Sequence, residues 1–451
     1  MTDAKPLAEA MDRRTPAEEV GRQVPAEVIV HNVVILDGAP VAPTTANATA
    51  PTERATAPTE RASTSVADSD PGEGWIAAAG GVVVARGHGP SWKQLSTSAT
   101  ARIVDGNGGF LAPAYVDLHC HGAGGVSAED LMAGTADAAS TADAPGLAEI
   151  LAVHRAHGTR ALALSFVSDT IDGLCLSLSA GAEAARSAPG ILGLHAEGPF
   201  LSPDFKGAHA PEVLTAPTPE AVERILSAAD GTLVQVTLAP ELPGAIETIG
   251  RFTSAGVRVA IGHTAADYAQ AAEAFDAGAT ILTHAFNAMP GIHHRAPGPV
   301  LAAIDAGQVT LELINDGVHV ATPAARMLAN LAPGRIALIT DAMAATGMDD
   351  GRYMLGSLPV QVEDSVARLV AADGTVGSIA GSTLTMDDAV RRAVIEVGLS
   401  PFDAVRAASL TPLRALGLVA ENADELLAVG MPAEFLLLET DLSIRESWIP
   451  G

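Results

Sequence analysis

Two histidines, His119 and His121, lie one residue apart at the end of the short apolar run YVDLHCHGAGG, which begins at Tyr115 and then breaks into glycines. Alternate residues of a β-strand point to the same face of a sheet, so both imidazoles can face one point while Cys120 turns the other way. Imidazole is a common ligand of zinc and other divalent ions. The spacing therefore predicts that these two histidines can share a metal ion.

Further polar side chains come at the ends of other short apolar runs. Parallel strands buried on both faces tolerate such side chains only at their carboxyl ends, where barrel active sites lie. A single histidine of this kind could equally be a hydrogen-bonded core residue. Their coincidence at five strand ends favours one site that holds one or two divalent ions. Besides the histidine pair, these residues are Glu197, His263, His284 and Asp341.

Other histidines receive a structural interpretation. His154 and His157 lie in the helical text LAEILAVHRAHG, and we expect them to be solvated or to cap a helix end. His195 precedes Glu197 by two residues, and we expect it to support the site through a hydrogen bond rather than to bind metal.

Eight apolar runs alternate with alanine-rich segments of helical period between residues 112 and 414. This alternation is typical of βα units around a parallel sheet, and eight units favour an α/β fold, a (β/α)8 TIM-like barrel. A doubly wound open sheet gives the same alternation, so periodicity leaves both folds open. The predicted strands are AYVDLHCH, TRALALSF, ILGLHAE, LVQVTLAP, VRVAIGH, ATILTHA, VTLELIND and RIALITDA.

Strand-like text also occurs at both ends of the chain, for example EVIVHNVVILDG from Glu27 and AEFLLLETDLSI near the C-terminus. We therefore expect a small β-sandwich domain built from residues 26–111 and 415–451. Residues 1–25 are polar and aperiodic, which predicts a disordered leader. The seven-residue repeat in TAPTERATAPTERAS predicts that residues 39–72 form a flexible insertion.

Composition excludes several classes of partner. The chain has 451 residues with 53 acidic and 26 basic side chains, and its net charge of -27 would repel nucleic acid and anionic membranes. Any anionic substrate must therefore be held by local donors. The chain has two cysteines, no signal peptide and no apolar run long enough to span a bilayer, so we expect a cytoplasmic protein.

From about residue 112 to the C-terminus, the sequence around the polar strand ends resembles the amidohydrolase superfamily. Within that superfamily it resembles the N-acetylglucosamine-6-phosphate deacetylases. The texts HAEGPFLSPDFKGAH and THAFNAMP are the most specific. Other superfamily members generally use a lysine on the fourth strand, and LVQVTLAPE offers none. Departures are small: alanine stands before EGPF where a bulkier apolar residue is common, and LAPAYVDLH lacks the usual Pro-Gly.

The resemblance implies a role for each polar strand end. Glu197, His263 and His284 would bind the metal that the family always keeps, and the pair His119 and His121 would allow a second ion. Zinc is the expected metal. Metal-bound hydroxide would attack the acetamide of N-acetylglucosamine-6-phosphate, with Asp341 as general base and then acid, to give acetate and glucosamine-6-phosphate. His319 would stabilise the oxyanion. The implied substrate contacts are Ala208, His209, Asn287, Ala288, Arg295, Asp316, His319, Ile379, Ala380 and Gly381.

Phosphate recognition is expected from Arg295, in GIHHRAPG, because a guanidinium matches phosphate geometry, although a surface salt bridge is the commoner fate of an arginine. The resemblance also implies a homodimer in which one subunit reaches its neighbour's phosphate site, and the roles of His293 and His294 stay open. Two rivals remain. One is another amidohydrolase-superfamily hydrolase or deaminase, and the other is a non-catalytic sugar-phosphate-binding protein, which would not need Asp341.

Overall fold

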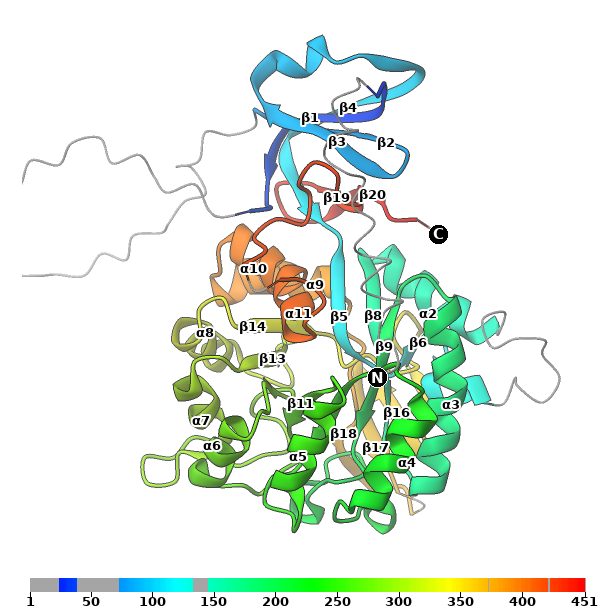
Figure 1. Ribbon diagram of the computed structural model, residues 1–451, viewed down its shortest axis with the longest axis vertical. Helices are drawn as coiled ribbons and strands as arrows, with labels where there is room; N and C mark the ends of the chain where they lie inside the picture. The colour runs from blue at the N-terminus through cyan, green and yellow to red at the C-terminus, as the bar shows by residue number, and fades with distance from the viewer. Residues whose placement is uncertain (1–23, 39–72, 133–144, 372, 421, 451) are drawn as a thin grey trace, which may run out of the picture.

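The computed structural model describes residues 24–38, 73–132, 145–371, 373–420 and 422–450. The predictions for a leader and for a repeat insertion at 39–72 fall on residues outside these ranges, apart from the last two of the leader. Figure 1 shows a large body of strands and helices joined by β5 to a smaller domain of strands. Within the described residues, every helix is too short or too polar to cross a bilayer.

Eight parallel strands form the larger body, and they neighbour one another in the order in which they follow along the chain. Each of the eight predicted runs supplies one strand. The outermost two meet through a parallel bridge between Cys120 and Ala342, so the sheet is a nearly closed barrel. The strands are β5 (Tyr115–Cys120), β8 (Thr159–Phe166), β9 (Ile191–Glu197), β10 (Leu233–Leu238), β11 (Arg258–Ile261), β12 (Ile281–Leu282), β13 (Thr310–Ile314) and β14 (Ile336–Ile339).

Helices connect the strands, and the chain's capping residues set their ends. Helix α6 begins where the Asp267 side chain accepts the Gln270 backbone N–H while the Gln270 side chain accepts the Asp267 backbone N–H, and Gly278 follows its last turn. The α-helices are α2 (Pro145–Ala156), α3 (Ile171–Ser187), α4 (Pro219–Ala229), α5 (Ala245–Ser254), α6 (Tyr268–Asp276), α7 (Gly298–Ala306), α8 (Thr322–Leu331), α9 (Met386–Arg392), α10 (Pro401–Ala407) and α11 (Leu410–Ala415), with a π-helical turn η7 (Ala393–Val397) after α9.

The smaller domain is built from both chain ends, as predicted. Its strands form one six-stranded sheet in the order β20-β19-β4-β1-β2-β3, and β19 pairs antiparallel with β4. One group of buried side chains contains Val30, Ile76 and Phe435, and a separate group contains Ile29 and Trp75. The strands are β1 (Ala26–Ile35), β2 (Gly74–Ala79), β3 (Val82–His88), β4 (Thr97–Pro113), β19 (Phe435–Leu438) and β20 (Ile444–Trp448).

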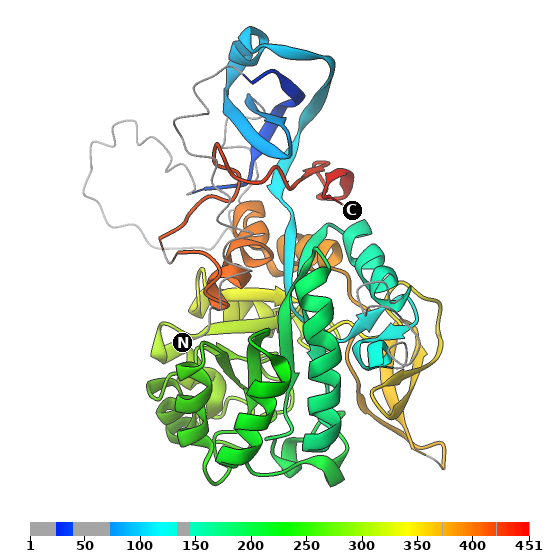
Figure 2. The same ribbon diagram turned by 45° about the vertical axis from the view of Figure 1, so that its right-hand side comes forward.

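A second sheet, which the sequence analysis did not predict, follows β14. It is the gold sheet in Figure 2, with four antiparallel strands. Its buried Leu355 and Val360 pack with Met343 and Ala344, which follow β14. The chain thus leaves the barrel after its last strand and returns beside that strand's end. The strands are β15 (Gly351–Leu355), β16 (Leu358–Glu363), β17 (Val366–Val370) and β18 (Val376–Ile379).

Candidate metal and active site

Three side chains from three strand ends converge on one point. Glu197 ends β9, while His263 and His284 each stand two residues beyond the last residue of β11 and β12. Glu197 Oε1 lies 3.1 Å from His263 Nε2 and 3.2 Å from His284 Nε2. The two Nε2 atoms are 3.0 Å apart. All three residues are buried, so their polar atoms face one another inside the barrel.

The first-strand pair adjoins the same carboxylate. The Nε2 atoms of His119 and His121 are 3.1 Å apart. His119 Nε2 lies 3.5 Å from Glu197 Oε1, and His121 Nε2 lies 3.3 Å from Glu197 Oε2. Glu197 therefore belongs to two groups of three possible metal ligands. One carboxylate can serve one ion or bridge two.

Hydrogen bonds at the opposite ring nitrogens decide which way the lone pairs point. Nδ1 of His121 lies 3.1 Å from the Ser165 carbonyl oxygen, and Nδ1 of His263 lies 3.1 Å from the Phe205 carbonyl oxygen. Because a carbonyl can only accept, these contacts assign the proton to Nδ1 and leave a lone pair on Nε2. Ring nitrogens and a carboxylate that converge at about 3 Å need positive charge between them, from a metal ion or from protons on the rings, and imidazole with carboxylate is a donor set that suits zinc. The site thus fits a divalent metal.

Asp341 stands on the same side as the first-strand pair. It lies two residues beyond the last residue of β14, and its Oδ1 is 3.5 Å from His121 Nε2 and 3.6 Å from His119 Nε2. Its side chain retains about 11% exposure, against 4% for Glu197. Asp341 is therefore the carboxylate of the cluster that solvent or a substrate reaches more easily.

The backbone at these strand ends is held in an uncommon conformation. The φ angle is positive at His263 (45°), His284 (26°) and Asp341 (51°). It is also positive at Ala288 (49°). Left-handed φ is costly for residues with a Cβ and persists where the surrounding structure enforces it, often at functional sites. The clustering of these residues supports a functional interpretation of the strand ends.

Mutual charge shifts the ionisation of the cluster. Burial alone would raise the pKa of the Glu197 carboxyl, but His119 and His121 hold it well below its ordinary value. Burial alone would lower the pKa of His119, yet Glu197 and Asp341 raise it well above its ordinary value, and the pKa of His121 moves the same way. Burial lowers the pKa of His263 to about 4. His263 is therefore neutral at physiological pH and available as a metal ligand.

His209 contacts the same carboxylate in the opposite tautomer. Its Nδ1 accepts the backbone N–H of Ser168 at 3.2 Å, so the proton lies on Nε2, 3.4 Å from Glu197 Oε2. Its ring also packs edge-on against His263, with 4.5 Å between centroids. The structure thus places this expected substrate contact directly at the metal ligands, and Ala208 beside it is partly buried.

The loop after β13 carries a second acid and imidazole pair. Asp316 Oδ2 lies 2.7 Å from His319 Nδ1, and Asp316 Oδ1 accepts the backbone N–H groups of Val318 and His319 at 2.8 Å each. Burial alone would raise the pKa of Asp316, but the bond to His319 leaves it below its ordinary value. The carboxylate therefore fixes the ring of His319 and keeps its Nε2 free to face a ligand.

Of the other expected substrate contacts, the segment 379–381 leads to Asp341, and Asn287 lies beside the His284 strand end. Gly381 adjoins the catalytic candidate, because a Cβ added there would lie 3.1 Å from the Asp341 carbonyl oxygen. Ile379 and Ala380 lead into it from β18. Asn287 instead turns its amide to the carbonyl oxygens of His284 and Ala285.

Arg295 lies on an exposed loop, as do His293 and His294, whose ring centroids are 4.2 Å apart with the rings tilted by 46°. Within the described residues the Arg295 guanidinium has no hydrogen-bonding or ion-pair partner, so the expected alternative of a surface salt bridge has no support there. A free guanidinium on such a loop can bind an anion.

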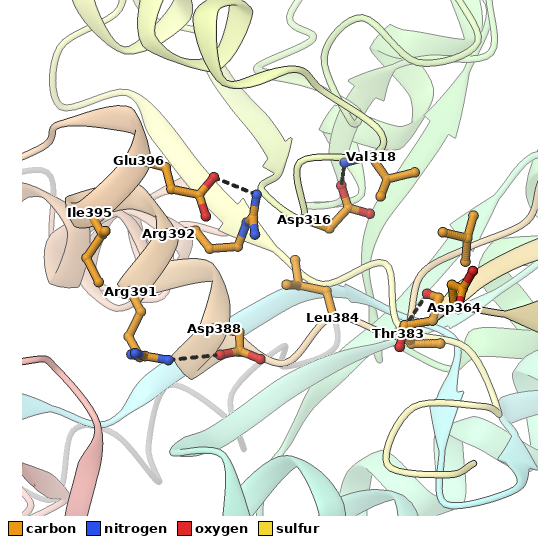
Figure 3. A pocket seen from close by; sticks show the side chains of 12 residues that line it. Asp316, Val318, Asp364, Thr383, Leu384, Asp388, Arg391, Arg392, Ile395 and Glu396 are labelled. Atoms are coloured by element: carbon orange, nitrogen blue, oxygen red, sulfur yellow. Dashed lines mark hydrogen bonds and ion pairs between the residues drawn. The ribbon is translucent and has the colours of Figure 1, made fainter. Parts of the chain in front are cut away.

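A pocket of about 550 Å³ lies beside the loop after β13 (Figure 3). Asp316 and Val318 line one side, and residues of α9 and η7 line another. Its two arginines are already paired, Arg391 with Asp388 and Arg392 with Glu396. None of the histidines lines it, so this pocket is separate from the metal-ligand cluster.

Two buried polar residues of the cluster were missed by the sequence analysis. Glu312, in the middle of β13, is fully buried and accepts hydrogen bonds from the Gln235 amide at 2.8 Å and the His284 backbone N–H at 3.2 Å. Asp117 accepts the backbone N–H groups of His119 and Thr340. The expectation that acids occur only at strand ends excluded both.

One expectation for a histidine is wrong. His154 is buried, not solvated, and its Nε2 lies 3.1 Å from the Sγ of Cys120 because the inner face of α2 packs on the barrel. His157 is half-exposed and pairs with Asp387 at 3.0 Å. His195 donates to or accepts from two hydroxyls, of Ser165 and Thr237, and so has the supporting role expected of it.

A nearly closed parallel barrel with imidazole and carboxylate groups that can bind metal at its strand ends, and an acid after its last strand, defines a metal-dependent hydrolase. The sequence profile of the amidohydrolase family matches residues 110–448, and the chain belongs to this family.

Three similar proteins are deacetylases of amino-sugar phosphates. An N-acetylgalactosamine-6-phosphate deacetylase of Escherichia coli O157:H7 is 37% identical over 388 residues, which is 84% of this chain and 95% of the relative. A human N-acetylglucosamine-6-phosphate deacetylase is 35% identical over 77% of this chain and 84% of its own. The solved Mycobacterium smegmatis N-acetyl-D-glucosamine-6-phosphate deacetylase, in complex with that sugar phosphate, is 40% identical with a TM-score of 0.74, over 83% of this chain and 93% of its own.

Proposed function

We propose that this chain hydrolyses the acetamide of N-acetylglucosamine-6-phosphate to acetate and glucosamine-6-phosphate, with zinc as the metal. The observation that carries the proposal is the position of Glu197 between two histidine pairs, with the partly exposed carboxylate of Asp341 beside the first pair. Relatives that share this fold are deacetylases of amino-sugar phosphates. A bound zinc ion would polarise the amide carbonyl and lower the pKa of a water molecule.

Asp341 is the proposed proton carrier. Its carboxylate accepts a proton from the water that attacks the amide carbon, and the O–H so formed later protonates the nitrogen of the departing sugar amine. The C–N bond breaks as the carbonyl re-forms, and the acetyl group leaves as acetate. The exposed edge of Asp341 supports this role, because the proton must move between water and substrate.

The remaining residues would bind and orient the sugar. His319, held by Asp316, points Nε2 away from its carboxylate partner, and from that position it would stabilise the developing oxyanion. His209 offers an Nε2–H to a sugar hydroxyl or to Glu197. Ala208, Asn287, Ala288 and the segment 379–381 complete the proposed sugar site.

Arg295 is the proposed phosphate ligand, supported by its exposed loop and by a guanidinium that has no hydrogen-bonding or ion-pair partner among the described residues. We place this loop at the contact of a homodimer, in which His293 or His294 reaches the partner's phosphate. The proposed catalytic domain is 112–414, with 26–111 and 415–451 as the end domain. A cytoplasmic location is supported by two free cysteines.

One observation favours a second substrate. The relative that aligns over 95% of its own length acts on the galactosamine epimer, which differs from the glucosamine compound in the configuration of one hydroxyl. The test is to incubate the purified protein with each N-acetylated sugar phosphate, with and without a chelator, and to measure acetate.

Acetate that appears with one or both sugars, disappears with chelator and returns with added zinc supports the proposal. Asp341→Asn should abolish turnover while retaining sugar-phosphate binding. Binding with no acetate from either sugar would instead indicate a sugar-phosphate-binding protein. Release of ammonia from another substrate, again without acetate, would indicate a deaminase.

A further inference from the structure

Glu312 is a buried carboxylate for which the proposed reaction has no use. It lies in the middle of β13 with no exposed surface, among residues of three other strands or strand ends. Its Oε1 accepts the Gln235 amide at 2.8 Å. Its Oε2 lies 3.3 Å from His119 Nδ1 and accepts the His284 backbone N–H at 3.2 Å. A charge with this burial persists only where donors surround it.

The contact with His119 decides the tautomer of that ring. A carboxylate whose other contacts are donors accepts the imidazole proton as well, so the Nδ1 of His119 carries the proton and Nε2 turns a lone pair toward Glu197. Backbone carbonyls do the same for His121 and His263. Among these three rings, His119 is the one held by a side chain, so mutation can remove its acceptor.

We propose that Glu312 is a positioning residue that holds His119 in the Nδ1–H tautomer and thereby builds the His119, His121 and Glu197 half of the metal centre. The inference rests on the proposed metal centre but not on the identity of the substrate. A purely structural role would predict a loss of stability on mutation without a selective effect on one ion.

Gln235 makes a conservative variant informative. Its Oε1 is buried and has no hydrogen-bonding partner among the described residues, so its amide can turn over. In Glu312→Gln, the new side-chain oxygen can keep the contacts with His119 and His284 while its NH₂ donates to the turned Gln235. The acceptor at Nδ1 is then retained without the charge, whereas Glu312→Ala removes it.

The experiment titrates metal-free protein with zinc by calorimetry and measures bound zinc per chain. We expect wild type to bind two ions, and Glu312→Ala to bind the second about 10- to 100-fold more weakly while the first stays within a few-fold. Glu312→Gln should approach wild type. Gln235→Leu is the matched control, because it removes a donor to Glu312 and, among the described residues, no side-chain hydrogen bond to a histidine; its second site should stay within a few-fold.

Nitrogen NMR of the zinc-loaded wild type is a second measurement that does not depend on the folding of a Glu312 variant, with the His119 signal assigned by its loss in His119→Asn. It should show Nδ1 protonated and Nε2 on the metal. Zinc on Nδ1, a single ion in wild type, an unchanged second site in Glu312→Ala, or Glu312→Gln as defective as Glu312→Ala would each overturn the proposal. If these results hold but no acetate is released, the proposed function fails and the role of Glu312 stands.

Discussion

Replacing Thr340 by valine should loosen the seam at which the barrel closes. Strands β5 and β14 share little of a regular ladder, and Asp117 joins them by accepting the Thr340 hydroxyl at 2.5 Å and the Thr340 backbone N–H at 3.2 Å. The same hydroxyl accepts the backbone N–H of Ala342 at 3.1 Å. This seam sets the spacing between His119 on β5 and Asp341 after β14.

The expected loss in the free energy of unfolding follows from the hydrogen bonds that the variant removes. Thr340→Val removes a hydrogen bond to a buried carboxylate, at about 1.5–3 kcal/mol, and orphans the N–H of Ala342, at about 1–3 kcal/mol. We therefore expect the free energy of unfolding to fall by about 3–5 kcal/mol in urea titrations. Because small misplacements of reacting groups are costly, kcat for acetate release should fall about 10- to 100-fold.

Thr411→Val is the matched control. The Thr411 hydroxyl is also buried but has no hydrogen-bonding partner among the described residues, so its loss should be neutral or slightly stabilising and leave kcat unchanged. A loss of less than about 1 kcal/mol in Thr340→Val, or equal effects of the two variants, would refute the role of the seam.

Three further predictions concern pH and backbone space. The pKa values of His119 and His121 are raised, whereas that of His263 is about 4, so on acidification protons should displace metal from the first two before the third. Bound metal measured against pH should therefore fall in two steps. A single step would contradict this prediction. Asp387 raises the pKa of His157 above 6.5, so the pair's stability is fully present below pH 6.5 and lost as pH rises through the raised value. At the acid end, burial alone would raise the pKa of Asp387, but its interactions with His157 and Thr385 together hold it below 3.8, and its contribution is lost as pH falls through that lowered pKa. Because the His157 side chain is 37% exposed, His157→Gln should cost only about 0.2–1 kcal/mol at pH 5.5 and nothing at pH 9, and equal losses would contradict the assignment. Gly207→Ala and Gly231→Ala both place alanine at left-handed φ, of 55° and 78°, and each should lower the free energy of unfolding by about 1–2 kcal/mol. A Cβ at position 207 would also lie 2.8 Å from Cε1 of the His263 ring, whereas a Cβ at position 231 would meet nothing within 4 Å. Only Gly207→Ala should weaken zinc binding, and equal zinc affinity in both variants would count against His263 as a ligand.

The strand ends were predictable because parallel barrels obey one simple rule. Polar side chains that close several buried apolar runs together indicate one active site at the carboxyl ends of the strands, and this rule predicted the convergence of Glu197, His263 and Asp341. The same rule concealed Glu312, which lies in the middle of its strand. Its burial is tolerated because His119, Gln235 and His284 contact its carboxylate. These partners are far from Glu312 in the sequence, so the local pattern could not predict them.

Two other misses have different causes. His154 follows Leu147, Ile150 and Leu151 at helical spacing on the buried face of α2, so periodicity could have shown that it points inward. The sheet from β15 to β18 was overlooked because its short strands interrupt the alternation of strand and helix that the barrel imposes. This sheet returns the chain to Gly381, beside Asp341.

The most direct test of the metal centre is anomalous diffraction from zinc-loaded crystals, measured on both sides of the zinc absorption edge. A peak is predicted at about 2.0–2.2 Å from Glu197 Oε1, His263 Nε2 and His284 Nε2 together. A map in which zinc lies elsewhere, or in which these three side chains diverge around solvent, would contradict the account.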